Sequence, residues 1–228
     1  MTTPTIYIIG DSTASNKRKE ARPETGWGEC LATYFQDQIT IDNLAVNGRS
    51  TRSFIQEGQL EALEYLIHAG DYLLIQFGHN DQKIEDPNRY TTIGDYQKNL
   101  RLFIEVARKQ GATPILLTSV TRRQFDGDQI TPLSVGEYPQ ATLAVAASEK
   151  VVVLDIHQRS RHFFNQLGPE ASKSYFMHLA PRIAANYPEG SADDTHLSPL
   201  GAQAVAQIVV TAIKENTNSL TPYLNHQK

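Results

Sequence analysis

The chain has 228 residues, of which 20% are charged, and a formal net charge of −4 with neutral histidines. This length suits a single α/β domain, because such domains commonly run to about 200–250 residues, and we expect one domain over residues 1–228. The pI near 6.0 excludes a broad basic field for nucleic acid or an anionic membrane, and no apolar stretch approaches the roughly 18 residues of a membrane span.

Short apolar runs alternate with helical patterns along the whole chain. Five near-continuous apolar runs predict parallel strands covered on both faces: Thr5–Ile9, Thr40–Ala45, Tyr72–Phe77, Pro114–Thr118 and Val151–Asp155. The apolar stripe of Gly94–Gln110 predicts a helix that ends at Gly111, and Ser198-Pro199 opens the last long helix. This alternation predicts the α/β class, as a three-layer αβα sandwich around a doubly wound parallel sheet.

In such sheets, ligands bind outside the carboxyl ends of the strands. Polar clusters stand after three predicted strands and before the last helix. They are Gly10-Asp11-Ser12, Asn47-Gly48-Arg49-Ser50-Thr51, Gly78-His79-Asn80-Asp81 and Asp193-Asp194-Thr195-His196. We expect these four segments to converge on one mouth.

Ser12 has two readings. An isolated Gly-Asp-Ser is typical of a helix N-cap or turn, whereas a nucleophile needs a base within hydrogen-bond reach and donors aimed at an oxyanion. The G-x-S-x-G elbow of α/β-hydrolases is absent, and the stretch has neither a G-x-G-x-x-G nor a Gly-Lys-Ser/Thr phosphate motif.

The pair Asp193 and His196 is also ambiguous by itself. A carboxylate three residues before a histidine can accept from one imidazole nitrogen and stabilise the imidazolium. Alternatively, Asp193 or Asp194 satisfies the amides of a polar loop. Asp193-x-x-His196 alone leaves both interpretations open.

Gly48 fits either a turn with positive φ or a backbone N–H that approaches an oxyanion unhindered by a Cβ. Asn80 is either an ordinary turn residue or a source of two side-chain donors. Together with Ser12, Asp193 and His196, these two residues supply every part of an acyl-transfer site, at strand ends or before a helix. This combination favours Ser12 as a nucleophile.

Four stretches resemble the SGNH (GDSL) hydrolases: "GDSTAS", "NLAVNGRSTRSF", "FGHND" and "DDTHLSPLGA". Together with "FMHLAPRIAANYPEGSADDTH", they look like the rhamnogalacturonan acetylesterases within that superfamily. The resemblance implies a flavodoxin-like fold with five parallel strands. It implies that Ser12 is the nucleophile, that His196 is the general base oriented by Asp193, and that the Ser12 and Gly48 amides and Asn80 form the oxyanion hole.

The implied activity is that of a serine esterase, without cofactor or metal, that removes acetyl groups from pectic oligosaccharides. Other acetylated sugars, such as xylan, are alternative substrates. A metallohydrolase using His79, Asp81, Asp193 and His196 is a second alternative, although no H-E-x-x-H pair is present. A catalytically silent carbohydrate-binding domain is the third.

Five arginines lie on or near predicted loops, where a bidentate guanidinium suits a uronate carboxylate, unless local acids pair with it. They are Arg49, Arg52, Arg122, Arg123 and Arg182. The Asp-Gly pair in "TRRQFDGDQI" predicts a hairpin over the mouth. Cys30 is the one cysteine, and residues 1–4 lack signal-peptide features, so we expect a cytoplasmic protein.

Overall fold

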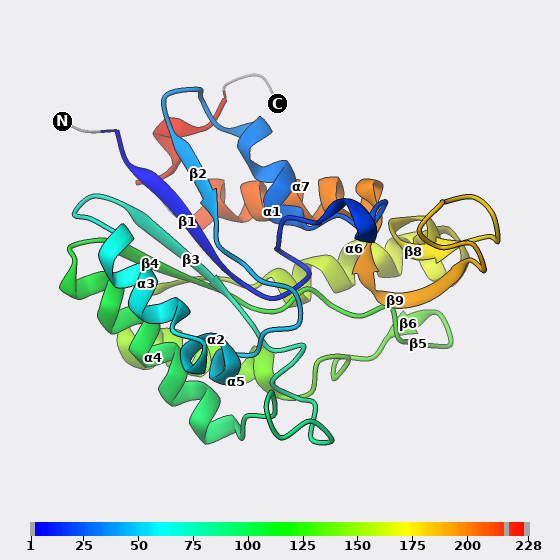
Figure 1. Ribbon diagram of the computed structural model, residues 1–228, viewed down its shortest axis with the longest axis horizontal. Helices are drawn as coiled ribbons and strands as arrows, with labels where there is room; N and C mark the ends of the chain where they lie inside the picture. Colours follow the sequence, from blue (N-terminus) through cyan, green and yellow to red (C-terminus); the bar gives the residue numbers. More distant parts are fainter. Residues whose placement is uncertain (1–2, 217–218, 226–228) are drawn as a thin grey trace.

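The computed structural model describes residues 3–216 and 219–225, and its centre is a five-stranded parallel sheet in the order β2-β1-β3-β4-β7 (Figure 1). The strands are β1 (Thr5–Gly10), β2 (Thr40–Asn43), β3 (Tyr72–Gln76), β4 (Thr113–Leu117) and β7 (Val152–Leu154). Each strand is parallel to its neighbours. The predicted α/β class and the five predicted strands are therefore confirmed. The strand order reverses between β1 and β3, where such sheets bind ligands.

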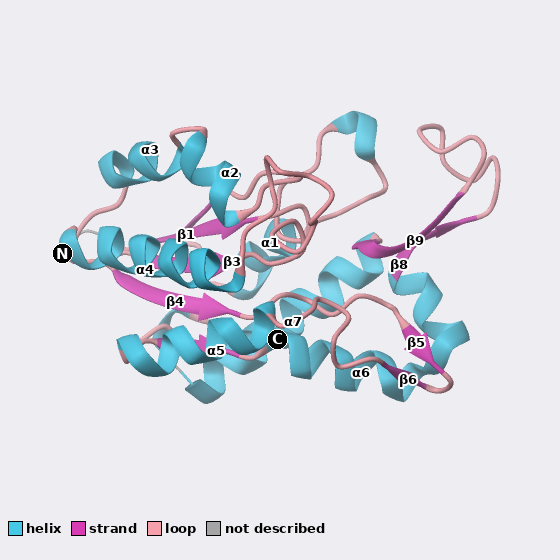
Figure 2. Cartoon of the chain, turned by 90° about the horizontal axis from the view of Figure 1, so that it is seen from below, coloured by secondary structure: helices cyan, strands magenta, loops and turns pink. Residues whose placement is uncertain are grey.

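Helices cover both faces of the sheet, which makes three layers (Figures 1 and 2). One face carries α1 (Trp27–Leu31), α6 (Ile156–Ala171) and α7 (Pro199–Asn216). The other carries α2 (Thr51–Gln56), α3 (Gln59–Leu66), α4 (Ile93–Lys109) and α5 (Tyr138–Glu149). These helices leave the carboxyl ends of the strands open to the connecting loops.

The continuous apolar runs in the sequence follow from this layering. In β1, Ile6 and Ile8 belong to the core under α1 and α7, whereas Tyr7 and Ile9 belong to the core under α4. Successive side chains of a strand point to opposite faces, so a strand buried on both sides needs apolar residues at every position. The strand therefore lacks the alternating pattern of a half-exposed sheet.

Helix α4 has the apolar stripe and the C-terminal glycine that its sequence predicts, together with an N-cap. Thr92 caps its first turn by accepting from the Asp95 amide, and Gly111 follows its end with φ +75°. Its buried stripe is Tyr96, Leu100, Phe103, Ile104 and Ala107. The predicted helix over Gly94–Gln110 is confirmed to within one residue at each end.

Two antiparallel hairpins lie outside the main sheet. The Asp-Gly turn is confirmed as a hairpin of β5 (Phe125–Asp126) and β6 (Gln129–Ile130). Strand β6 is bound to Asn165 of α6, and the placement of the hairpin over the mouth stays a prediction. The second joins β8 (Phe176–Leu179) to β9 (Ser191–Leu197).

Strand β9 corrects one expectation, because Asp193 to His196 lie in a strand and not in a loop before α7. Asp193 pairs with Met177 of β8. The segment is polar and only half-buried, so its sequence carries no apolar run that would mark a strand.

Helix α7 packs directly on the turn that leads into β8. A Cβ on Gly201 would lie 1.8 Å from the Tyr175 carbonyl oxygen, which only glycine tolerates. None of the described helices is long and apolar enough to cross a membrane.

Candidate active site

The four predicted segments meet at one end of the sheet. Figure 2 shows β1, β3 and β4 pointing toward a cluster of loops, with the β8–β9 hairpin beyond it. Ser12 follows β1, Asn80 follows β3 and Gly48 lies between β2 and α2. His196 reaches the same place from β9, although it is 184 positions from Ser12 in the chain.

Three of the predicted residues form a continuous hydrogen-bonded chain. Ser12 Oγ lies 3.0 Å from His196 Nε2, and His196 Nδ1 lies 2.6 Å from Asp193 Oδ2. Because the carboxylate only accepts, Nδ1 carries the proton and Nε2 is left to accept from the hydroxyl. The other Asp193 oxygen accepts from the amides of Thr195 (2.7 Å) and His196 (2.9 Å), which fixes the carboxylate in place.

The surroundings shift the pKa values of this pair in opposite directions. Burial works to raise the pKa of Asp193, but the hydrogen bond and charge of His196 and the two amide donors outweigh it and hold the pKa well below its usual range. Burial works to lower the pKa of His196, yet the bond to Asp193 and the negative charges of Glu24 and Asp193 raise it above its usual value. Asp193 is therefore ionised, as an orienting carboxylate must be.

Potential oxyanion donors lie on the loops beside Ser12. Gly48 has φ +75°, a conformation that glycine adopts without strain and that leaves its amide unscreened by a side chain. Within residues 3–216 and 219–225, the amides of Ser12 and Gly48 donate no hydrogen bond to another protein group. Two backbone donors are thus available next to the hydroxyl.

Asn80 is almost fully buried at the same edge. Its Nδ2 donates to the Arg49 carbonyl at 3.1 Å, and its Oδ1 accepts from Arg89 at 3.4 Å. One of the two side-chain N–H groups is therefore used to tie the β3 loop to the residue after Gly48. The other is available as a donor.

A buried ion pair that no sequence motif indicates lies beside the Ser12 loop. The side chain of Lys17 is fully buried, and its Nζ lies 2.7 Å from Glu24 Oε1. The same ammonium donates to the Ser12 carbonyl and, at 2.8 Å, to Asn47 Oδ1. Lys17 thus connects the loop that carries Ser12 to the residue before Gly48.

Glu24 also lies near the histidine. Its Oε1 is 3.9 Å from His196 Nε2, on the side of the ring opposite Asp193. His196 therefore has carboxylates at both nitrogens and the ammonium of Lys17 beyond one of them. In the sequence, Lys17 and Glu24 look like ordinary surface charges, because lysine is almost never fully buried unless it is paired.

Of the four residues proposed as metal ligands, Asp193 and His196 contact each other, whereas His79 and Asp81 have other partners. His79 Nδ1 faces Asp11 Oδ2 at 3.0 Å, and its Nε2 faces the Val120 carbonyl at 2.9 Å. Asp81 accepts from the Thr51 amide at 3.0 Å, and burial raises its pKa to about 7. No group of three or more His, Cys, Asp or Glu side chains in the described part of the chain has metal-binding geometry.

Two of the candidate arginines brace strand β9. Arg123 Nε pairs with Asp194 Oδ1 at 2.6 Å, and Arg122 donates to the Thr195 hydroxyl. Asp194 also lies 2.6 Å from His178 of β8. These contacts hold the strand that carries Asp193 and His196, so Arg122 and Arg123 are already engaged by the protein.

Comparison with known proteins places the chain in one family. The model of the GDSL-like lipase/acylhydrolase family matches residues 8–204. Rhamnogalacturonan acetylesterase RhgT of Bacillus subtilis is 41% identical, over 92% of this chain and 89% of its own. Probable rhamnogalacturonan acetylesterase YesY of the same organism is 34% identical, over 92% of each chain. The crystal structure of Bacillus subtilis YxiM is 28% identical and superposes with a TM-score of 0.81, over 94% of this chain and 57% of that one. The resemblance in the four stretches is thereby confirmed, and the chain belongs to the GDSL-like lipase/acylhydrolase family of carboxylic-ester hydrolases.

Proposed function

We propose that this protein is a serine esterase that removes O-acetyl groups from pectic, rhamnogalacturonan-type oligosaccharides. The observation that carries the proposal is the chain from Ser12 Oγ through His196 to Asp193, with links of 3.0 and 2.6 Å. The substrate class rests on similarity to RhgT and YesY, which are described as a rhamnogalacturonan acetylesterase and a probable one.

In the first half of the reaction, Ser12 Oγ attacks the acetyl carbonyl carbon while His196 Nε2 accepts the hydroxyl proton. Negative charge then develops on the carbonyl oxygen. Three hydrogen bonds stabilise this oxyanion, donated by the amides of Ser12 and Gly48 and by the free N–H of Asn80. When the tetrahedral intermediate collapses, the sugar oxygen leaves with the proton from His196, and the acetyl group stays on Ser12.

In the second half, water replaces the sugar hydroxyl. His196 takes a proton from the water as its oxygen attacks the acetyl-Ser12 carbonyl, and the same donors hold the second oxyanion. Acetate leaves as Ser12 recovers its proton. Throughout, Asp193 fixes the imidazole and stabilises its positive charge, which the carboxylate can do because it remains ionised.

The substrate class is tested by acetate release from acetylated rhamnogalacturonan oligosaccharides and from acetylated xylo-oligosaccharides of equal length. We expect a higher kcat/KM on the pectic substrate. A higher kcat/KM on the xylan-type substrate would contradict the proposed substrate while leaving the esterase mechanism in place. Labelling of Ser12 by a fluorophosphonate, located by peptide mass spectrometry, tests the mechanism independently of the sugar.

A further inference from the structure

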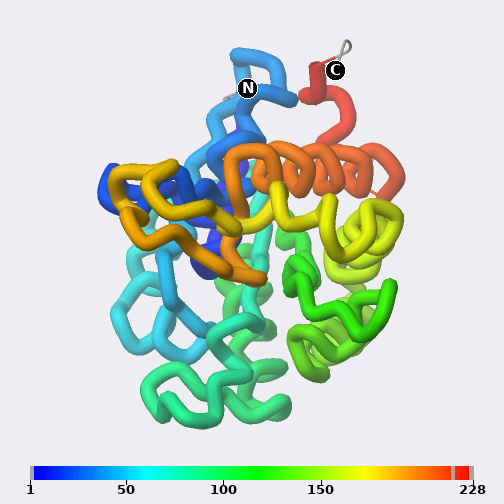
Figure 3. The backbone as a smooth tube through the Cα atoms, turned by 90° about the vertical axis from the view of Figure 1, so that its right-hand side faces the viewer, coloured from blue at the N-terminus to red at the C-terminus, as the bar shows by residue number. Residues whose placement is uncertain are grey.

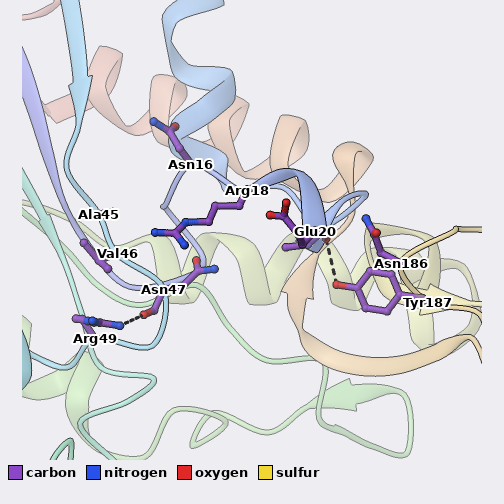
Figure 4. Close-up of a pocket in the computed structure, with 10 residues that line it drawn as sticks. Asn16, Arg18, Glu20, Ala45, Val46, Asn47, Arg49, Asn186 and Tyr187 are labelled. Atoms are coloured by element: carbon purple, nitrogen blue, oxygen red, sulfur yellow. Dashed lines mark hydrogen bonds between the residues drawn. The ribbon is translucent and has the colours of Figure 1, made fainter.

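A cavity of about 1040 Å³ lies beside the Ser12 site (Figure 4). Its walls come from the loop after β1, the loop after β2 and the connection between β8 and β9. Figure 3 shows this connection, in yellow and orange, lying against the blue segment that follows β1. The lining includes Arg18, Asn47, Arg49 and Tyr187, so it is polar and has one exposed aromatic edge.

The wall of the cavity is linked to the Ser12 loop through the buried ammonium of Lys17. Asn47, in its wall, accepts at 2.8 Å from Lys17, whose ammonium also donates to the Ser12 carbonyl. Asn47 also immediately precedes Gly48. A sugar in this cavity would therefore lie next to the loops that carry Ser12 and Gly48.

The two arginines in the wall differ in their partners. Arg49 Nε pairs with Glu57 at 2.8 Å, and Arg49 also donates to the Asn47 carbonyl at 2.9 Å. The Arg18 carbonyl accepts from the Ala21 amide at 3.1 Å, whereas the Arg18 guanidinium makes no hydrogen bond or ion pair with any group in residues 3–216 or 219–225. In the view of Figure 4, its side chain extends toward Asn47 and away from Glu20. The cavity thus contains a cation that the protein itself does not neutralise.

The segment that carries Arg18 is held in place by the β8–β9 connection. Asn186 Nδ2 donates to the Lys19 carbonyl at 2.9 Å, and Tyr187 Oη donates to the Ala21 carbonyl at 3.1 Å. These bonds fix the backbone immediately after Arg18. The backbone of Arg18 therefore has a fixed position in the cavity wall. Only the side-chain torsions of Arg18 need to change for its guanidinium to contact a ligand.

We propose that Arg18 binds the carboxylate of a uronate residue next to the acetylated sugar. The proposal rests on the pectic substrate proposed above and adds the residue that distinguishes acidic from neutral acetylated sugars. A guanidinium presents parallel donors that match the two carboxylate oxygens. Glu20 lines the same cavity, and its negative charge repels an anionic ligand. Replacing Glu20 should therefore change KM in the opposite direction to replacing Arg18.

The test compares Arg18→Gln with wild type on acetylated rhamnogalacturonan oligosaccharides that have free carboxylates. We expect KM to rise about three- to tenfold with kcat nearly unchanged, because the lost contact is charge-assisted but partly solvated. On p-nitrophenyl acetate, and on the same oligosaccharides after methyl esterification, the variant should match wild type. Glu20→Gln should lower KM on the acidic substrate.

Arg108→Gln is the matched control, since Arg108 pairs with Glu149 at the far end of α4. It should leave every parameter unchanged. An unchanged KM for Arg18→Gln on the acidic substrate would overturn the subsite, as would an equal rise on the methyl-esterified one. If wild type cleaves p-nitrophenyl acetate but none of the pectic oligosaccharides, the proposed substrate itself fails and the subsite fails with it.

Discussion

At the scale of single residues, His196 has a carboxylate near each of its ring nitrogens. Asp193 binds Nδ1 at 2.6 Å and sets the tautomer, while Glu24 lies 3.9 Å from Nε2 and contributes charge without a hydrogen bond. Lys17 pairs with Glu24 and partly offsets that charge. Asp193 therefore affects both the orientation and the pKa of the base, whereas Glu24 affects the pKa of the base through its charge.

The pH profile of kcat/KM tests the effect of Glu24. A base works only when neutral, so activity falls as pH drops through the raised pKa of His196, and we expect the acid limb to have its midpoint above the usual value of about 6.5. Glu24→Gln removes the negative charge while Asp193 and Lys17 remain, so the midpoint should move to lower pH. An unchanged or higher midpoint in Glu24→Gln would contradict this effect of Glu24. Glu105→Gln on α4 is the control, and its midpoint should equal that of wild type.

Asn80 is expected to act on charge that develops during the reaction. Replacing it by alanine removes one oxyanion donor, and such losses typically cost about 10²–10³ in kcat. Because Asn80 also holds the Arg49 carbonyl, the melting temperature must be measured beside kcat. A stable Asn80→Ala protein with near wild-type kcat would show that the side chain only supports the loop.

At the scale of elements, buried polar contacts hold the strand-end loops together. Asp11 after β1 meets His79 after β3 at 3.0 Å, and Asp81 after β3 accepts from the amide of Thr51 at the start of α2 at 3.0 Å. Each contact joins two segments that are distant in sequence. This network keeps the donors and the hydroxyl in fixed relative positions, which oxyanion stabilisation requires.

Asp81 gives this network a pH-dependent stability. Burial raises its pKa to about 7, whereas an unfolded aspartate titrates near 3.9, so the folded state binds the proton more tightly. Stability from this group is present at low pH and is lost as pH rises from about 4 to about 7. Asp81→Asn cannot ionise, so its stability relative to wild type should increase across that window, by up to about 4 kcal/mol in unfolding free energy. Parallel stability curves from pH 4 to 8 would contradict the assignment.

The same elements show what the sequence could and could not predict. The five strands and α4 were predictable because burial on defined faces imposes apolar periodicity. Strand β9 was not, since its polar residues pair with β8 across a long connection and most of them are only partly buried. The Asp-Gly hairpin was found because its signal is local.

At the scale of the whole molecule, the site joins the two ends of the chain. Ser12 and His196 meet at 3.0 Å because β1 is an inner strand of the sheet and β9 leads back across its carboxyl edge to α7. Parallel topology alone predicted that Ser12, Gly48 and Asn80 would share this edge. The buried pair Lys17–Glu24 and the cavity beside it depend on packing between loops, which no local pattern encodes. The single domain and the cytoplasmic location stay predictions.

The most direct test of the account is acetate release from acetylated rhamnogalacturonan oligosaccharides by wild type and by Ser12→Ala, both in EDTA. Ser12 makes its side-chain hydrogen bond to His196, so the alanine variant should fold normally, which circular dichroism can verify. We predict steady acetate release by wild type and none above background by the variant. Release by Ser12→Ala at the wild-type rate would show that Ser12 is not the nucleophile.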